Sequence, residues 1–67
     1  MIFSTVNSSD LAGVAVNGNN LVIMFRSGGI YEYADAAVEF FNIMNASSKG
    51  KYFHQNIKPY YMCRKIR

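Results

Sequence analysis

The sequence predicts an α+β fold in which a small antiparallel β-meander packs on one amphipathic helix, followed by a basic C-terminal segment. Two turn signals separate short apolar segments in the first half of the chain, Asn17-Gly18-Asn19-Asn20 and Ser27-Gly28-Gly29. Asn and Gly tolerate positive φ values and are typical of tight hairpin turns. Near residue 35 the apolar spacing changes from the strand period to the helical period, which indicates a helix after the strands.

Strands are expected at residues 11–16, 21–26 and 30–33. The second of these segments is rich in β-branched and aromatic residues, which favour the extended conformation. In the third, Tyr31 and Tyr33 share one face because side chains alternate along a strand. This face is expected to pack against the helix, and the alternative is that the two rings form a platform for a stacked base.

The helix is expected at residues 35–48, with Asp35 as its N-cap and Gly50 just beyond its end. An Asp side chain accepts hydrogen bonds from the unpaired amides of a first helical turn. An apolar stripe at helical spacing is formed by Ala37, Phe40, Phe41 and Met44. The aromatic and methionine side chains of this stripe, with Met24, are expected to supply most of the core.

The charge of the chain is divided unevenly along its length. Residues 1–48 carry one basic and four acidic side chains, whereas residues 49–67 carry six basic side chains and no acid. Pro59 interrupts this basic segment because proline lacks an amide donor. We expect a short helix or an extended stretch before Pro59 and an added strand after it, within residues 60–66. A basic segment with interleaved aromatic residues can attract polyanions, and it can equally serve as a solubilising C-terminus.

The 67 residues are expected to form a single domain. A chain of this size buries only about 60% of the surface that it exposes when unfolded, and the lone Cys63 cannot form an internal disulfide. A homo-oligomer or a docked domain is therefore expected. The sequence contains no apolar run that approaches the roughly 20 residues needed to span a bilayer and no signal-peptide pattern. A cytoplasmic location without membrane association is expected.

The residues expected to contact a phosphate-bearing ligand are basic or aromatic. Lys49 and Lys51 flank Gly50 in a segment where ammonium groups and backbone amides could meet a phosphate, although the helix dipole also favours lysines at a helix end. Arg side chains can hold a phosphate through two parallel hydrogen bonds. The complete candidate set is Arg26, Tyr31, Tyr33, Lys49, Lys51, His54, Lys58 and Arg64.

The sequence gives no indication of a catalytic or metal site. A zinc site needs about four ligands, and the chain offers one His and one Cys. A Cys–His nucleophile pair would also need an orienting group and an oxyanion hole, and the four acidic residues show no spacing typical of a catalytic dyad. We expect a non-enzymatic protein that uses no cofactor.

Three segments resemble the motifs of the KTSC domain family. Residues 6–9 resemble V-x-S-S, residues 25–33 resemble F-x-x-G-G-x-Y-x-Y, and residues 46–53 resemble A-x-S-x-G-x-Y-F. The family occurs as single-domain bacterial and phage proteins and at the C-terminus of some lysyl-tRNA synthetases, and RNA binding has been suggested for it. The resemblance covers nearly the whole chain in the correct order.

The resemblance and the basic C-terminal third together imply a non-catalytic binding module for phosphate-bearing ligands, with RNA or a nucleotide as the partner. The alternative is a small phage-type protein that inhibits a bacterial defence system. Such a protein would bind a bacterial partner protein or would sequester a nucleotide signalling molecule as a homo-oligomer.

Overall fold

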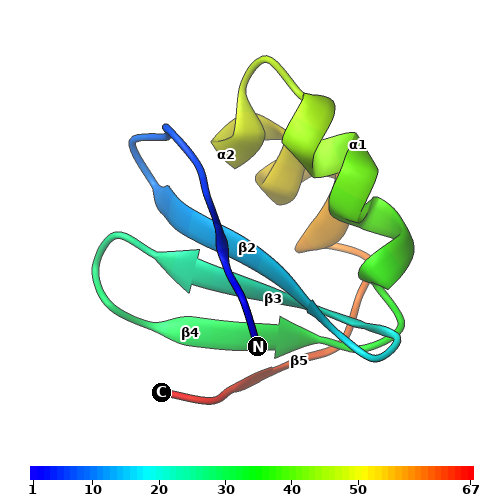
Figure 1. Ribbon diagram of the computed structural model, residues 1–67. Coiled ribbons are helices and arrows are strands. Elements are labelled where there is room, and N and C mark those ends of the chain that lie inside the picture. The colour runs from blue at the N-terminus through cyan, green and yellow to red at the C-terminus, as the bar shows by residue number, and fades with distance from the viewer.

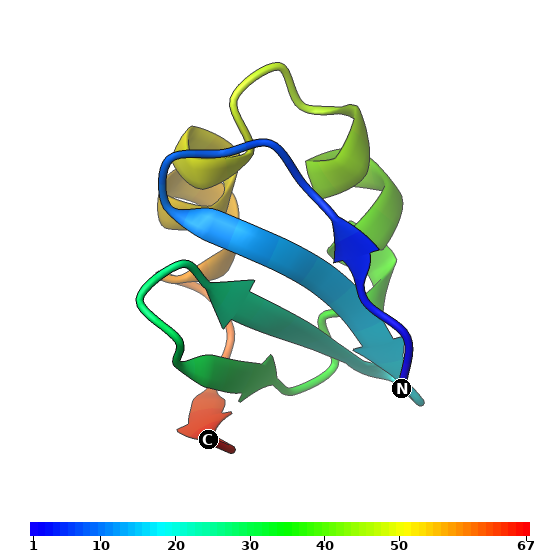
Figure 2. The same cartoon turned by 60° about the vertical axis from the view of Figure 1, so that its left-hand side comes forward.

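The computed structural model describes residues 1–67 and places a layer of short helices against one face of a five-stranded antiparallel sheet (Figure 1). The strands follow chain order across the sheet: β1 (Ser4–Thr5), β2 (Leu11–Asn17), β3 (Asn20–Phe25), β4 (Ile30–Tyr33) and β5 (Cys63–Lys65). The helices lie behind the sheet in Figure 2, and the N-terminal segment crosses in front of β2 in Figure 1. The α+β class and the added C-terminal strand are confirmed.

The helical layer consists of four short pieces. These are a 3-10 turn η1 (Ala37–Glu39), the helix α1 (Phe40–Asn45), the helix α2 (Lys49–Tyr52) and a π-helical turn η2 (Phe53–Ile57). The helix predicted at residues 35–48 is therefore shorter than expected. The segment before Pro59 is helical, in agreement with one of the two predicted alternatives. No helix in the structure is long and apolar enough to cross a bilayer.

The predicted caps of the first helix are wrong. Asp35 adopts a φ of 58°, and its amide donates a hydrogen bond to Asn20 Oδ1 at 3.0 Å, so it belongs to the turn that leaves β4. The helical turn begins after Ala36 without a side-chain cap. Gly50 does not follow the end of the first helix: α1 already ends at Asn45, and Gly50 lies inside α2.

Both predicted hairpin turns form, and their glycines have the positive φ values that the turns require. These are 62° at Gly18 and 106° at Gly28, in a region of backbone conformation that residues with a side chain rarely adopt. A β-bulge between Leu11 and Gly13 shifts the register of β2 against β3. Because of this extra residue, Leu11 and Val14 both reach the core although they are three positions apart.

The core lies between the sheet and the helical layer, and the predicted core residues are mostly not its members. Phe41 is 74% exposed, and Met24, Phe40 and Met44 are only partly buried. The residues that are buried against the sheet are instead Ile43 of α1 and Ala36, which directly precedes η1. The buried apolar cluster consists of Val6, Leu11, Val14, Leu21, Ile23, Tyr33, Ala36, Ile43, Phe53 and Ile57.

Tyr31 and Tyr33 face the helical layer, but their partners are not the aromatic residues of α1. The Tyr33 ring is 4% exposed and meets Phe53 of η2 edge-on, with ring centroids 5.4 Å apart. Burial raises the pKa of Tyr33. Tyr31 is half-buried and meets Phe25 of β3 edge-on at 5.6 Å. Tyr33 is therefore a core residue, and Tyr31 retains exposed surface.

The other face of the sheet buries one carboxylate, Glu32. It accepts hydrogen bonds from Asn20 at 3.0 Å, from Arg64 at 3.0 Å and from Asn17 at 3.1 Å. These donors, Asn20 foremost, hold the pKa of Glu32 below its usual value. The guanidinium of Arg64 therefore serves to pair a buried acid on this face.

A second carboxylate, Glu39, connects three parts of the chain. It accepts hydrogen bonds from the phenol of Tyr52 in α2 at 2.6 Å and from the phenol of Tyr61 before β5 at 2.8 Å. These two phenols, Tyr52 foremost, hold the pKa of Glu39 below its usual value, and the carboxylate in turn raises the pKa of both tyrosines. The C-terminal segment is thereby fastened to the helical layer.

The two carboxylates make the fold sensitive to acid. Their pKa values in the folded state lie below the ordinary value of 4.5, so the stability they supply is present above that pH. It is lost as the pH falls further, through the lowered pKa values. We expect a melting temperature that drops below about pH 4.5, with a shallower drop in a Glu39→Gln variant. Thermal melts across a pH series measure this, and an equal drop in both proteins would contradict it.

Candidate functional site

A polar cleft opens between the loop that precedes β2 and the beginning of α2. Its volume is about 580 Å³, and it is lined by residues 7–10, residues 47–51 and His54, none of them hydrophobic. Ligand pockets in proteins typically measure about 300–1,000 Å³ and are mostly apolar. A cleft of this size without a hydrophobic residue in its lining suits a small, highly polar group.

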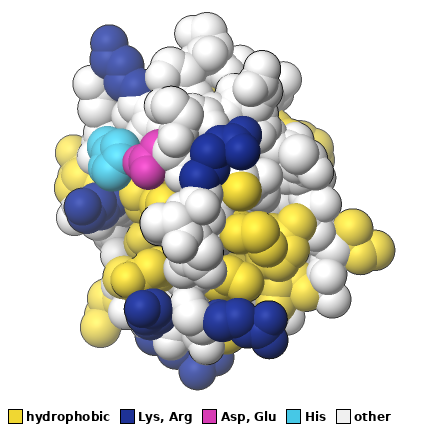
Figure 3. All heavy atoms as spheres, turned by 90° about the vertical axis from the view of Figure 1, so that its left-hand side faces the viewer, with side chains coloured by type: hydrophobic (Ala, Val, Ile, Leu, Met, Phe, Trp, Pro, Cys, Tyr) yellow, Lys and Arg dark blue, Asp and Glu magenta, His cyan; other side chains and the backbone are white.

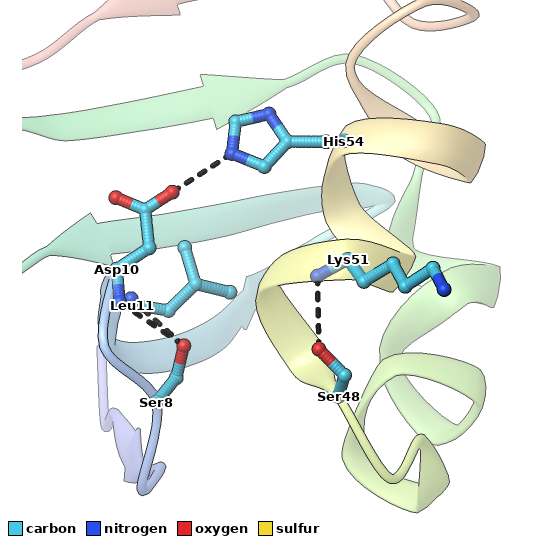
Figure 4. A network of polar contacts seen from close by, with 6 residues as sticks. All are labelled: Ser8, Asp10, Leu11, Ser48, Lys51 and His54. Carbon is cyan, nitrogen blue, oxygen red and sulfur yellow. Dashed lines mark hydrogen bonds and ion pairs between the residues drawn. The ribbon is translucent and has the colours of Figure 1, made fainter.

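The first wall of the cleft is a tight turn held by a serine side chain. Ser8 Oγ accepts hydrogen bonds from the amides of Asp10 and Leu11, both at 3.2 Å (Figure 4). Arg26 fastens the same turn through hydrogen bonds from its guanidinium to the backbone carbonyls of Ser8 and Val6. Arg26 therefore shapes this wall instead of lining the cleft.

The second wall is the first turn of α2. Ser48 caps this helix, and its Oγ accepts a hydrogen bond from the amide of Lys51 at 3.3 Å. The ammonium of Lys49 donates to the carbonyl of Ala46 at 2.9 Å and so braces the loop between α1 and α2. The side chain of Lys51 is exposed, extends away from Asp10 in Figure 4, and has no hydrogen-bond partner.

The two walls meet at one end of the cleft. His54 Nε2 lies 2.8 Å from Asp10 Oδ2, and the two side chains point toward one another from η2 and from the turn before β2 (Figure 4). A Cβ atom at Gly50 would lie 3.4 Å from Ser8 Oγ and 3.7 Å from the Cβ of Asp10. The walls therefore approach closely at Gly50: an added methyl group would just touch the opposite wall, and a side chain larger than alanine would push the walls apart.

The cleft contains hydrogen-bond donors that have no partner within the protein. Ser8 and Ser48 use their oxygen atoms as acceptors, while each hydroxyl retains its hydrogen for a further partner. Ser9 and Ser47 add two more hydroxyl groups to the lining. Asp10 is the only carboxylate there, and two lysines and the imidazole of His54 oppose it.

The structure brings some of the predicted site residues together and separates others. Lys49, Lys51 and His54 line the cleft. Tyr31, Tyr33 and Lys58 border a neighbouring hollow that His54 also lines. Two of the predicted residues lie in neither: Arg26 supports the first wall from outside, and Arg64 pairs with Glu32 on the other face of the sheet.

Sequence reasoning missed Ser8, Asp10 and Ser48 as site residues. Asp10 and His54 are 44 positions apart, so no local spacing links them. The available signal was the resemblance of residues 6–9 and 46–53 to family motifs, since these two segments supply most of both walls. The chain contains no group of three or more His, Cys, Asp or Glu side chains that could hold a metal ion.

Comparison with known proteins shows the relationship directly. The model of the KTSC domain family matches residues 7–61. The chain belongs to the KTSC domain family. The crystal structure of a KTSC domain protein from Yersinia pestis is 35% identical in sequence, with a TM-score of 0.83, and the match covers 98% of this chain and 97% of that chain. No match was found among curated proteins.

The three motifs that resemble the KTSC pattern converge in space. Residues 6–9 and 46–53 contribute to the two walls of the cleft, and residues 25–33 contribute Phe25, Tyr31 and Tyr33 to the neighbouring hollow. Segments that are distant along this KTSC chain therefore form one continuous region of its surface.

Proposed function

We propose that this KTSC domain is a non-catalytic binding module for phosphate-bearing ligands, with RNA or a nucleotide bound at the polar cleft. The observation that carries the proposal is the cleft itself, which no hydrophobic residue lines and which combines serine hydroxyls with lysines. Phosphate oxygens are pure acceptors, and hydrogen bonds from cationic donors to them are about twice as strong as neutral ones. The cleft offers both kinds of donor.

Lys51 is the principal free cation of this site. The ammonium of Lys49 is engaged by the carbonyl of Ala46, and the imidazole of His54 lies against Asp10. Lys51 has no such partner, and its flexible stem allows the ammonium to turn toward a ligand at the rim. Binding by the cleft therefore depends most on this one lysine.

A Lys51→Gln variant is expected to bind single-stranded RNA about tenfold more weakly at low salt, because a charge-assisted contact is removed. Each lost phosphate contact also reduces the slope of log affinity against log salt by about 0.7 for a single strand. Titration of a fluorescently labelled RNA at a series of salt concentrations measures both quantities.

The matched control is Arg67→Gln, which removes the same charge. Figure 2 places the C-terminus at the end of the molecule opposite the loop that precedes β2. We expect this variant to retain the affinity and the salt slope of the natural chain. Equal losses in the two variants would indicate attraction by net charge alone, and no binding at low salt would overturn the proposal.

A Gly50→Ala variant tests the cleft without altering its charge. The new methyl group would touch Ser8 and Asp10 at ordinary van der Waals distances, so the fold accommodates it while the cleft becomes narrower. Alanine inside a helix is more stable than glycine by about 0.5–1 kcal/mol. We expect a raised melting temperature and weaker RNA binding, measured by thermal melts and the same titration. A stabilised variant with unchanged affinity would place the ligand elsewhere.

The alternative function, inhibition of a bacterial defence system by a phage-type protein, stays a prediction. Its two forms, capture of a partner protein and sequestration of a nucleotide signal by a homo-oligomer, differ in what they require of the cleft. Only the second needs phosphate binding, so titration of the natural chain with a free nucleotide separates these two forms.

A further inference from the structure

A second depression lies directly beside the polar cleft and has a different character. It has a volume of about 370 Å³, and its floor is aromatic, formed by Phe25, Tyr31, Tyr33 and Phe53. Lys58 stands at its border, exposed and without a hydrogen-bond or ion-pair partner. We call this depression the aromatic hollow.

The aromatic floor is rigid. Phe25 meets Tyr31 at a centroid distance of 5.6 Å and Phe53 at 5.4 Å, with interplanar angles of 85° and 72°. Gly29 allows the Tyr31 ring to approach the backbone closely, because a Cβ there would lie 3.3 Å from the ring. Tyr31 is thus held on two sides while part of its ring remains exposed, which is the state of a preformed stacking surface.

The cleft and the hollow share one wall, the pair formed by Asp10 and His54, which lines both depressions. In Figure 3 the imidazole and a carboxylate lie side by side, hydrophobic atoms adjoin them, and basic side chains surround them. A ligand that fills both depressions must therefore carry an anionic group on one side of this pair and a flat ring on the other.

The shared wall also offers a free acceptor. Asp10 Oδ2 lies against His54, whereas Oδ1 makes no hydrogen bond in the structure. Asp10 lines both the polar and the aromatic depressions, so a ligand that joins a phosphate to a ring would place its linking group near this carboxylate. A sugar hydroxyl is the donor that suits a carboxylate at this position.

We propose that the two depressions together bind one ribonucleotide unit, with its phosphate in the cleft, its ribose at Asp10 and its base against Tyr31 in the aromatic hollow. This assignment rests on the proposed phosphate-binding function of the cleft and adds the class of ligand. The same unit occurs in a free nucleotide and in an RNA strand.

The test compares AMP with ribose 5-phosphate by isothermal titration calorimetry on the full chain. Stacking of a base on an aromatic ring contributes substantially to affinity, so AMP is expected to bind at least about tenfold more tightly. A Tyr31→Leu variant is expected to lose this preference, and Tyr31→Phe is expected to keep it. Tyr60→Leu, which alters an exposed tyrosine that does not line the hollow, is the control and should behave as the natural chain.

The outcomes separate the two levels of the proposal. Equal affinities for AMP and ribose 5-phosphate in the natural chain would overturn the base site and leave the phosphate site standing. Absence of binding by both compounds and by RNA would overturn both. The comparison in the natural chain decides the question even where Tyr31→Leu does not fold. An oligoadenylate titrated beside AMP distinguishes the sources: tighter binding of the strand supports an RNA ligand, and equal affinity supports a free nucleotide.

Discussion

Replacing Phe53 by alanine is expected to lower the free energy of unfolding by about 3–5 kcal/mol, the usual cost of removing a buried aromatic ring. Phe53 is 1% exposed, and its ring centroid lies 5.4 Å from those of Phe25 and Tyr33, so the substitution leaves a cavity in the core. A domain of this length is stabilised by roughly 3–10 kcal/mol in total. A loss of this size leaves the variant barely folded or unfolded. Chemical denaturation followed by circular dichroism measures it.

The matched control for this prediction is Phe41→Ala. It removes the same group from α1, where the Phe41 ring is 74% exposed, and it is expected to change the free energy of unfolding by no more than about 0.5 kcal/mol. Comparison of the two variants shows which face of the helical layer packs against the sheet. A greater loss for Phe41→Ala would contradict the observed packing and restore the apolar stripe predicted from the sequence.

The second large effect is expected at Glu39. In a Glu39→Gln variant the side chain keeps one acceptor oxygen and loses its charge, while two phenols, of Tyr52 and Tyr61, still require a partner. Hydrogen bonds to charged groups are the stronger ones. We expect a fall in melting temperature of about 5–10 °C and faster amide hydrogen exchange in β5, because Tyr61 fastens the segment that leads into that strand.

Asp35→Asn supplies the control for Glu39→Gln. It makes the same carboxylate-to-amide change at an exposed residue whose side chain has no hydrogen-bond partner in the structure. Asn tolerates the positive φ at this position as well as Asp does. The melting temperature of this variant should match that of the natural chain, and a comparable fall would mean that net charge, not the phenol contacts, determines the effect.

The β-meander could be predicted from the sequence because its determinants are local. Gly18 and Gly28 lie in turns that need positive φ values, and β3 between them is rich in the β-branched and aromatic residues that favour a strand. The orientation of the helical layer was harder to predict from the sequence. The set of Ala37, Phe40, Phe41 and Met44 and the set of Ala36, Phe40 and Ile43 both fit a helical stripe, and only packing against the sheet selects the second.

The candidate site depends on contacts between distant segments, which a single sequence does not encode in its spacing. Charge and residue type indicated Lys49, Lys51, His54 and Tyr31. They also indicated Arg64, whose guanidinium is drawn instead to the buried Glu32 by a contact across strands β4 and β5. The serine oxygens of the cleft were overlooked because serines in a loop are common and become distinctive only when two walls face one another.

The most direct test of the account is to map the ligand on the molecule itself. AMP is added to isotope-labelled protein, and the amide signals are followed by nuclear magnetic resonance. The account predicts that the largest shifts occur in residues 7–10, in residues 47–54 and around Tyr31, with little change in α1. Shifts centred on the exposed face of α1 or spread along the basic C-terminal residues would contradict the assignment of the cleft as the binding site.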